Sequence, residues 1–143
     1  MEYPRRYIPK SLTNKDKKIQ KKQLDKSVAD YKKGKFTKRK KLPSFKSKTS
    51  EYTKNIKEKL GVPLNVDKIA DKLTRTDKRE KELKEGLGLI VKKGKGAYYS
   101  SGSRPNQTAF SWGKGRLASV LSGGYARKRD MDIVKKYKIP LIK

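Results

Sequence analysis

The chain has 143 residues, enough for one domain of ordinary size, and its 41 lysine and arginine residues exceed its 14 acidic residues by 27. It contains no cysteine and no histidine, which excludes disulfide scaffolds, thiolate metal sites and the serine–histidine–aspartate triad. No apolar stretch reaches the ~20 residues of a membrane span. The first ten residues also lack the apolar region of a signal peptide, so a soluble protein with a thin core is expected.

The net charge of +27 predicts a polyanionic partner. Like charges repel one another as the chain compacts, and phosphates relieve that repulsion while releasing their own counterions. Nucleic acid is the first expectation, an acidic capsid protein the second, and a membrane surface a distant third. Lysine outnumbers arginine by 32 to nine, which favours contact with backbone phosphates over base readout. Nonspecific binding, with DNA as the first choice, is therefore expected.

The N-terminal part of the chain is predicted to hold one helix followed by an extended arm. Residues 14–33 form the helix, because Thr13 suits its start and Gly34 its end. Its apolar stripe is one residue wide and consists of Leu24, Val28 and Tyr31. Residues 34–48 are rich in lysine, have no helical period and contain Pro43, so they are expected to be extended.

Three further helices are predicted in the middle of the chain, over residues 50–60, 66–73 and 76 onward. The last of them is expected to end at Gly94 and Gly96, because glycine weakens a helix.

The C-terminal part begins with turn chemistry over residues 97–108. A small hairpin around Tyr98–Tyr99 is the one β element that the sequence allows. Helices over residues 108–122 and 130–138 follow.

The predicted fold class is mostly α. It comprises about five or six short helices, an extended basic N-terminal arm and a Gly/Ser-rich turn. The expected division is a basic arm with one amphipathic helix, residues 1–48, and a small helical domain that carries the turn, residues 49–143.

One stretch supports a family resemblance: KKGKGAYYSSGSRPNQTAFSWGKGRLASVLSGGYARK, from Lys92 to Lys128. It combines an aromatic pair, a Ser-Gly-Ser-Arg-Pro turn and a helix with tryptophan, in that order. The chain resembles a family of small, highly basic proteins of unassigned activity encoded by giant DNA viruses of the phycodnavirus and mimivirus-like groups. Arg5–Leu24 and Lys41–Lys54 resemble that family as well. The resemblance implies a virion protein, present in the host cytoplasm or nucleus during assembly, that packages the genome or cements the particle.

The turn and its flanks form the best candidate binding surface. Small hydroxyls, amides and free backbone N–H groups before a helix suit phosphate or carboxylate. Arg104 would supply a two-pronged contact, and the tyrosines would stack on bases. The alternative is a tight structural turn with the tyrosines packed in the core. The residues predicted to form this surface are Tyr98, Tyr99, Ser101, Ser103, Arg104, Gln107 and Arg116.

Basic clusters mark the remaining expected contacts with a polyanion. They are Arg5, Arg6, Lys38, Arg39, Lys40, Lys41, Lys92, Lys93, Arg127, Lys128 and Arg129.

Catalytic motifs are poor. Ser111 and Lys114 form an S-x-x-K pattern, but 11 serines and 32 lysines produce such matches by chance. No catalytic residue, metal site, cofactor or small-molecule substrate is predicted. The expected function is a non-enzymatic structural protein of a virus particle, in genome packaging or as a minor capsid or cement protein. The alternative is a small nucleic-acid enzyme or an accessory DNA-binding factor.

Overall fold

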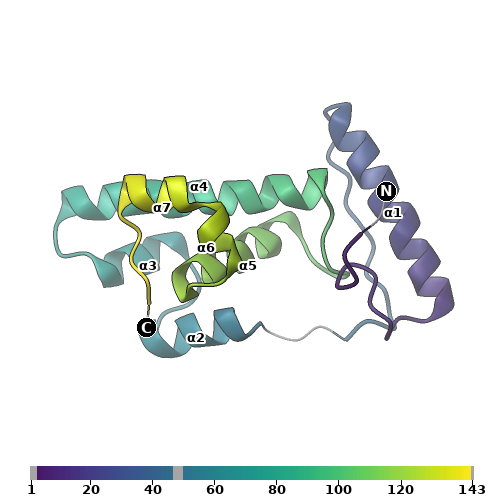
Figure 1. Cartoon of the computed structure of the whole chain (residues 1–143), viewed down its shortest axis with the longest axis horizontal. Helices are drawn as coiled ribbons and strands as arrows, with labels where there is room; N and C mark the ends of the chain where they lie inside the picture. Colours follow the sequence, from purple (N-terminus) through teal and green to yellow (C-terminus); the bar gives the residue numbers. More distant parts are fainter. Residues whose placement is uncertain (1–2, 47–49, 143) are drawn as a thin grey trace. The chain divides into compact units, whose positions relative to one another are not determined.

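The structure is a computed structural model that describes residues 3–46 and 50–142, and these residues are mostly helical (Figure 1). Within them no β-strand occurs. The described helices, in chain order, are α1 (Asn14–Lys32), α2 (Glu51–Leu60), α3 (Val66–Leu73), α4 (Asp77–Ser100), α5 (Ala109–Ser122), α6 (Tyr125–Arg129) and α7 (Met131–Tyr137). The predicted fold class, mostly α with several short helices, is confirmed.

Capping residues determine where the first two helices begin and end. The Thr13 hydroxyl accepts a hydrogen bond from the Asp16 N–H at 3.2 Å at the start of α1, and Ser50 caps α2 in the same way. Gly34 and Gly61 follow these helices with φ of +82° and +66°, the left-handed region that glycine adopts without steric cost. Both helices therefore lie where the local signals predicted them.

Helix α4 is longer than predicted. It continues through Gly94 and Gly96, so the predicted end at these glycines and the predicted hairpin around Tyr98–Tyr99 are both wrong. A glycine inside a helix costs only about 1 kcal/mol relative to alanine. The burial of apolar side chains such as Val91 and Tyr98 on the same helix outweighs that cost. The short helix α6 is an element that no sequence signal indicated.

The chain divides into two compact units. The first contains the described residues before 47 together with residues 95–112, and the second contains residues 50–94 and the described residues from 113 onward. The expected division assigned everything after residue 48 to one domain. The difference is that residues 95–112, which carry the Gly/Ser-rich turn, pack with the N-terminal residues.

The second unit has an apolar core built by α2 to α7 and the adjoining loops. Its fully enclosed side chains include Ile56, Ile69, Leu83, Leu87, Ile90, Leu117 and Leu121. Helix spacing places these residues on one face of each helix.

Glycine allows α4 and α5 to approach closely within the second unit. A Cβ added at Gly94 would lie 2.5 Å from the Gly113 Cα, and one added at Gly113 would lie 2.6 Å from the Val91 carbonyl oxygen. Ordinary carbon contacts lie at about 3.5–4.0 Å. Because the opposing atoms belong to the backbone, no side-chain rotation relieves such a clash, and both positions require glycine.

We expect Gly94→Ala to destabilise the protein by at least about 2 kcal/mol, because the added methyl group forces the two helices apart. Gly88→Ala is the matched control, since it lies on the same helix and its added Cβ meets no atom within 4 Å. The control should stabilise the protein by about 0.5–1 kcal/mol through higher helix propensity. Chemical unfolding followed by circular dichroism measures both changes, and equal effects would contradict the close approach.

The first unit has a smaller apolar core in which α1 lies against the turn and the N-terminal residues. Its buried apolar side chains are Tyr7, Leu12, Leu24, Val28, Leu42 and Tyr98. The rings of Tyr7 and Trp112 meet edge to face, with centroids 5.8 Å apart.

The extended segment after α1 is hydrogen-bonded to a polar stripe on that helix. The stripe repeats every seven residues, at Asp16, Gln23 and Asp30, so its members lie on the same side. Each member accepts a hydrogen bond from the segment: Asp30 from the Thr37 hydroxyl at 2.5 Å, Gln23 from the Lys40 N–H at 2.9 Å, and Asp16 from the Ser44 N–H at 3.1 Å. The segment therefore runs antiparallel to α1.

The spacing of the hydrogen-bonding residues along α1 matches the spacing of their partners along the extended segment. Seven helical residues rise by about 10.5 Å, and three or four extended residues span about 10–13 Å. Residues 35–42 are extended, as predicted, but they are held along α1 and do not form a free arm. A turn follows at residues 43–44, where the Phe45 N–H donates to the Leu42 carbonyl at 3.1 Å, and residues 47 and 48 of the predicted arm lie outside the described residues.

Candidate nucleic-acid interface

The Ser-Gly-Ser-Arg-Pro turn packs against α1. Gly102 has φ of +98°, and a Cβ there would lie 3.0 Å from Leu24 Cδ2. Ser103 and Pro105 are buried, and the Ser103 carbonyl accepts a hydrogen bond from the Gln20 side chain at 3.4 Å. The centre of the turn therefore faces the interior of the first unit.

Arg39 holds the turn against α1 and the end of α4. Its Nη1 donates to Ser27 Oγ and to the Tyr98 carbonyl, each at 3.0 Å, and its Nη2 donates to Ser103 Oγ at 2.9 Å. The guanidinium also lies 3.7 Å from the centroid of the Tyr98 ring. Burial lowers the pKa of Arg39, although the guanidinium remains charged. No described carboxylate takes part, so neutral dipoles and an aromatic face hold this cation.

Tyr98 is only 3% exposed, and its hydroxyl donates to the Gln107 carbonyl at 3.1 Å. The prediction that Tyr98 stacks on bases is therefore wrong, because its ring is enclosed and covered by Arg39. The predicted anion contacts of Arg39 and Ser103 are corrected as well, because the polar groups of both side chains already form hydrogen bonds within the unit.

Asn106 joins the turn to the extended segment. The Leu42 N–H donates to Asn106 Oδ1 at 2.6 Å, and Asn106 Nδ2 donates back to the Leu42 carbonyl at 3.3 Å. Asn106 adopts φ of +62°, a conformation that asparagine tolerates better than most residues. Sequence analysis gave this residue no such role, since its partner lies 64 positions away.

Arg39→Ala and Arg104→Ala remove the same charge from two different environments. We expect Arg39→Ala to cost about 2–3 kcal/mol of stability, because three charge-assisted hydrogen bonds are lost. Arg104 is exposed, so its substitution should change stability by less than about 0.5 kcal/mol. Thermal and chemical unfolding of both variants test this difference, and a reversed order would make Arg104 the clamp of the turn.

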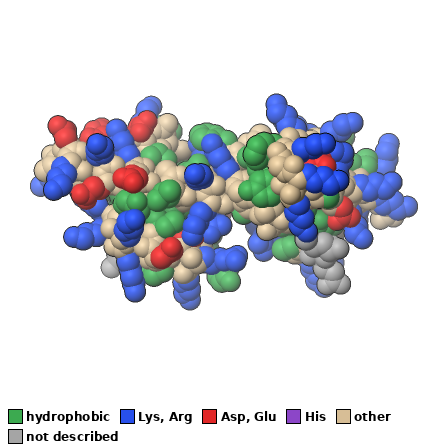
Figure 2. Space-filling model, turned by 90° about the horizontal axis from the view of Figure 1, so that it is seen from above, with side chains coloured by type: hydrophobic (Ala, Val, Ile, Leu, Met, Phe, Trp, Pro, Cys, Tyr) green, Lys and Arg blue, Asp and Glu red, His purple; other side chains and the backbone are tan. Residues whose placement is uncertain are grey.

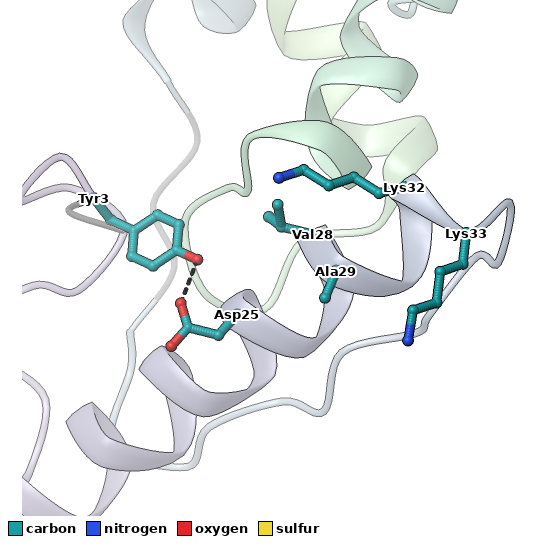
Figure 3. Close-up of a pocket in the computed structure, with 6 residues that line it drawn as sticks. All are labelled: Tyr3, Asp25, Val28, Ala29, Lys32 and Lys33. Atoms are coloured by element: carbon teal, nitrogen blue, oxygen red, sulfur yellow. Dashed lines mark hydrogen bonds between the residues drawn. The ribbon is translucent and has the colours of Figure 1, made fainter.

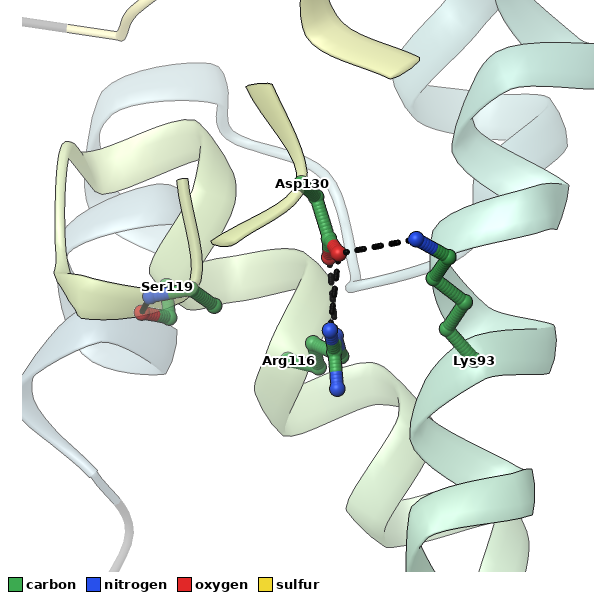
Figure 4. A network of polar contacts seen from close by, with 5 residues as sticks. Lys93, Arg116, Ser119 and Asp130 are labelled. Carbon is green, nitrogen blue, oxygen red and sulfur yellow. Dashed lines mark hydrogen bonds and ion pairs between the residues drawn. The ribbon is translucent and has the colours of Figure 1, made fainter. Parts of the chain in front are cut away.

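Arg116 forms a two-pronged ion pair with a buried carboxylate in the second unit (Figure 4). Its Nε and Nη2 donate to the two Asp130 oxygens at 2.8 and 2.7 Å, and Lys93 Nζ lies 3.5 Å from Asp130 Oδ1. The prediction that Arg116 binds an external anion is corrected, because the side chain already binds this one. Burial raises the pKa of Asp130, but the hydrogen bonds and charge of Arg116, with a smaller effect of Lys93, outweigh burial and leave it below the ordinary value.

Asp130→Asn should destabilise the protein by about 1.5–3 kcal/mol near neutral pH, because it breaks the charged pair. Asp132→Asn is the matched control, since this neighbouring carboxylate is exposed, and its effect should be small. The folded-state pKa of Asp130 lies below the unfolded value of about 3.9. Its stabilising contribution is therefore present above that value and is lost as the pH falls through the folded-state pKa. Unfolding free energies measured at decreasing pH should show the gap between wild type and Asp130→Asn closing; a constant gap would contradict the pairing.

Arg127 is a third predicted contact that the fold uses. Its Nη1 donates to the Val120 carbonyl at 3.0 Å, and its Nη2 donates to the Ile139 carbonyl at 2.9 Å. It thereby ties the C-terminal segment to α5.

The remaining predicted residues differ in exposure. Tyr99 and Gln107 are half-buried, and Gln107 Oε1 accepts a hydrogen bond from Ser111 at 2.7 Å. Lys93, besides its contact with Asp130, is exposed. The predicted side chains that stand in solvent and remain candidates for polyanion contact are Arg5, Arg6, Lys38, Lys40, Lys41, Lys92, Ser101, Arg104, Lys128 and Arg129.

A small pocket of about 350 Å³ lies beside α1, lined by Tyr3, Asp25, Val28, Ala29, Lys32 and Lys33 (Figure 3). The Tyr3 hydroxyl donates to Asp25 Oδ1 at 2.7 Å. Burial, and then this hydrogen bond, raise the pKa of Tyr3 well above its usual range. This hydrogen bond joins the N-terminal segment to α1, which together with the following Lys33 supplies the other lining residues.

Two aromatic residues were overlooked. Sequence analysis placed Tyr31 on the apolar stripe of the first helix and gave Phe36 no role, whereas the structure brings both against Tyr99. The signal available in the sequence was a phenylalanine within the lysine-rich run KGKFTK.

Comparisons with known proteins give no match: no protein-family model, no curated protein and no solved structure corresponds to the chain. Among the described helices, none is both long and apolar enough to cross a membrane. The described residues also contain no group of three or more acidic side chains placed to hold a metal ion.

Proposed function

We propose that this protein is a non-enzymatic structural component of a virus particle that binds nucleic acid without sequence preference. The observation that carries the proposal is the exposure of its lysines. Every described lysine is exposed except Lys17, Lys84 and Lys114, which are half-buried. A surface of this kind attracts phosphates and gains binding energy from released counterions.

The first unit is the more strongly charged. Residues 1–48 and 95–112 contain 20 lysine and arginine residues against four acidic ones, a net charge of +16, whereas the rest of the chain contains 21 against ten, a net charge of +11. The described carboxylates of the first unit, Asp16, Asp25 and Asp30, all accept hydrogen bonds from their own unit. They neutralise few of the exposed lysines, so we assign the main phosphate contacts to this unit.

The arginines support nonspecific binding. Specific base contacts most often use arginine in a two-pronged geometry. Four of the nine arginines already bond inside the protein: Arg39, Arg79, Arg116 and Arg127. Figure 2 shows lysine and arginine side chains across the visible face, with fewer acidic side chains among them. Exposed lysines that contact phosphates are insensitive to base sequence.

The proposed location in the virus particle rests on the resemblance to proteins of giant DNA viruses. The high positive charge favours packaging of the genome over cementing of the capsid. Protein analysis of purified particles, compared with infected-cell lysate, tests the location. Enrichment in the particle supports it, and absence from the particle refutes it.

The binding proposal is tested by titrating random duplex DNA at several salt concentrations. Affinity should fall steeply with salt and depend little on sequence, with a slope of about 0.9 per neutralised phosphate in a plot of log affinity against log salt. A flat salt response, or strong preference for one short sequence, would refute the proposal.

Two triple lysine-to-glutamine variants locate the contacts. The first changes Lys18, Lys21 and Lys22 on α1, none of which adjoins an acidic residue in the sequence. The control changes Lys68, Lys72 and Lys78, which are also exposed but each follow an aspartate. The α1 variant should reduce the salt slope by about two to three and weaken binding, because up to three phosphate contacts are lost. The control should have less than half that effect, since neighbouring carboxylates already repel phosphates. Equal losses would show that charge alone, and not its location in the first unit, decides binding.

A further inference from the structure

Three aromatic side chains from separate segments of the first unit form a cluster: Tyr31 of α1, Phe36 of the extended segment, and Tyr99 of α4. The rings of Tyr31 and Tyr99 are stacked, with centroids 5.8 Å apart and an interplanar angle of 13°. Phe36 meets Tyr99 edge to face at 5.0 Å. Both tyrosines are half-buried, but Phe36 is 69% exposed.

The backbone fixes Phe36 in this exposed position. The Lys35 N–H donates to the Asp30 carbonyl at 2.8 Å, and the Thr37 hydroxyl donates to the Asp30 carboxylate at 2.5 Å. Both neighbours of Phe36 are thus bonded to one residue of α1, and Gly34, with φ of +82°, makes the preceding reversal. The phenylalanine is therefore presented to solvent on a hydrogen-bonded turn and does not reach the core.

Positive charge surrounds the cluster in the sequence. The exposed lysines within two residues of Tyr31 or Phe36 are Lys32, Lys33, Lys35 and Lys38. Asp30 is the nearest acidic residue in the chain, and its carboxylate is bonded to Lys26 at 2.6 Å as well as to Thr37. An exposed aromatic ring among exposed lysines suits a ligand in which a flat apolar group is followed by an anionic group.

We propose that the cluster of Tyr31, Phe36 and Tyr99 is a stacking site for an unpaired base of single-stranded nucleic acid, with the neighbouring lysines contacting the flanking phosphates. The proposal rests on the proposed function and deepens it. Every base has a flat aromatic face, so stacking adds affinity without sequence preference. Bases inside a duplex are already stacked, so the site favours single strands.

The test compares two single strands with equal numbers of phosphates: an oligothymidylate about 12 nucleotides long and an abasic strand of the same length. Wild-type protein should bind the oligothymidylate on the order of five- to a hundredfold more tightly, the range expected for one stacked base. Phe36→Ala should remove most of that difference and leave the affinity for the abasic strand unchanged. Tyr125→Ala is the matched control, because Tyr125 is 71% exposed and lies beside Arg129, but it belongs to the second unit. It should change neither affinity.

Phe36→Leu separates stacking from packing, since leucine keeps an apolar side chain at this position without an aromatic face. It should lose the preference for bases as Phe36→Ala does, with an unchanged unfolding midpoint. If Phe36→Leu binds oligothymidylate like wild type, the stacking site is overturned.

The remaining outcomes separate the two proposals. Equal, salt-dependent binding of both strands by wild-type protein overturns the stacking site and leaves the proposed function standing. Binding of neither strand overturns both. If polyglutamate of equal charge binds as tightly as oligothymidylate and with the same dependence on Phe36, an acidic protein is the partner and the stacking site is overturned.

Discussion

A net charge of +27 opposes every compact conformation of this chain, because its lysines repel one another when folding brings them together. Hydrophobic residues make up only 32% of the sequence, so apolar burial leaves a small margin against that repulsion. The fold compensates with hydrogen bonds that hold cations on neutral groups. Arg127 donates to backbone carbonyls, and Arg39 donates to a carbonyl and two hydroxyls. Such bonds fix a guanidinium without using acidic residues, which the chain has in short supply.

Arginine and lysine side chains therefore have different roles in this fold. A guanidinium is weakly hydrated and carries five donors in a planar fork, so it suits half-buried positions where several acceptors converge. An ammonium group is strongly hydrated and remains in solvent at the end of a flexible stem. Four of the nine arginines bond inside the protein, whereas nearly all the described lysines stand in solvent. From the sequence, both types were predicted to be binding residues, and for this reason Arg39, Arg116 and Arg127 were wrongly assigned to the binding surface.

Features encoded by neighbouring residues were predictable from the sequence, whereas features encoded by distant pairs were not. Thr13 marks the start of α1 through its hydroxyl and Gly34 marks its end through a left-handed backbone conformation, and both were identified correctly. Gly94 was predicted to end a helix, although its role is to allow the close approach of Gly113, which lies 19 positions away in the sequence. The carboxylate of Asp130 gives no sign in the sequence that Arg116 binds it. The turn was recognised as unusual, but its partner, the extended segment, is separated from it by more than 60 residues.

The extended segment connects stability to the proposed binding. It is itself rich in lysine and lies along a lysine-rich helix, so hydrogen bonds to Asp16, Gln23 and Asp30 hold together two elements whose charges repel. Under the proposed function, phosphates that neutralise these lysines remove part of the repulsion that opposes docking of the extended segment on α1. A ligand that binds only the folded state stabilises it in proportion to its occupancy. The same docked segment presents Phe36, whose two neighbours are anchored to Asp30. Phosphate contact would therefore stabilise the hydrogen-bonded turn on which the aromatic cluster depends, so charge neutralisation and base stacking should reinforce each other.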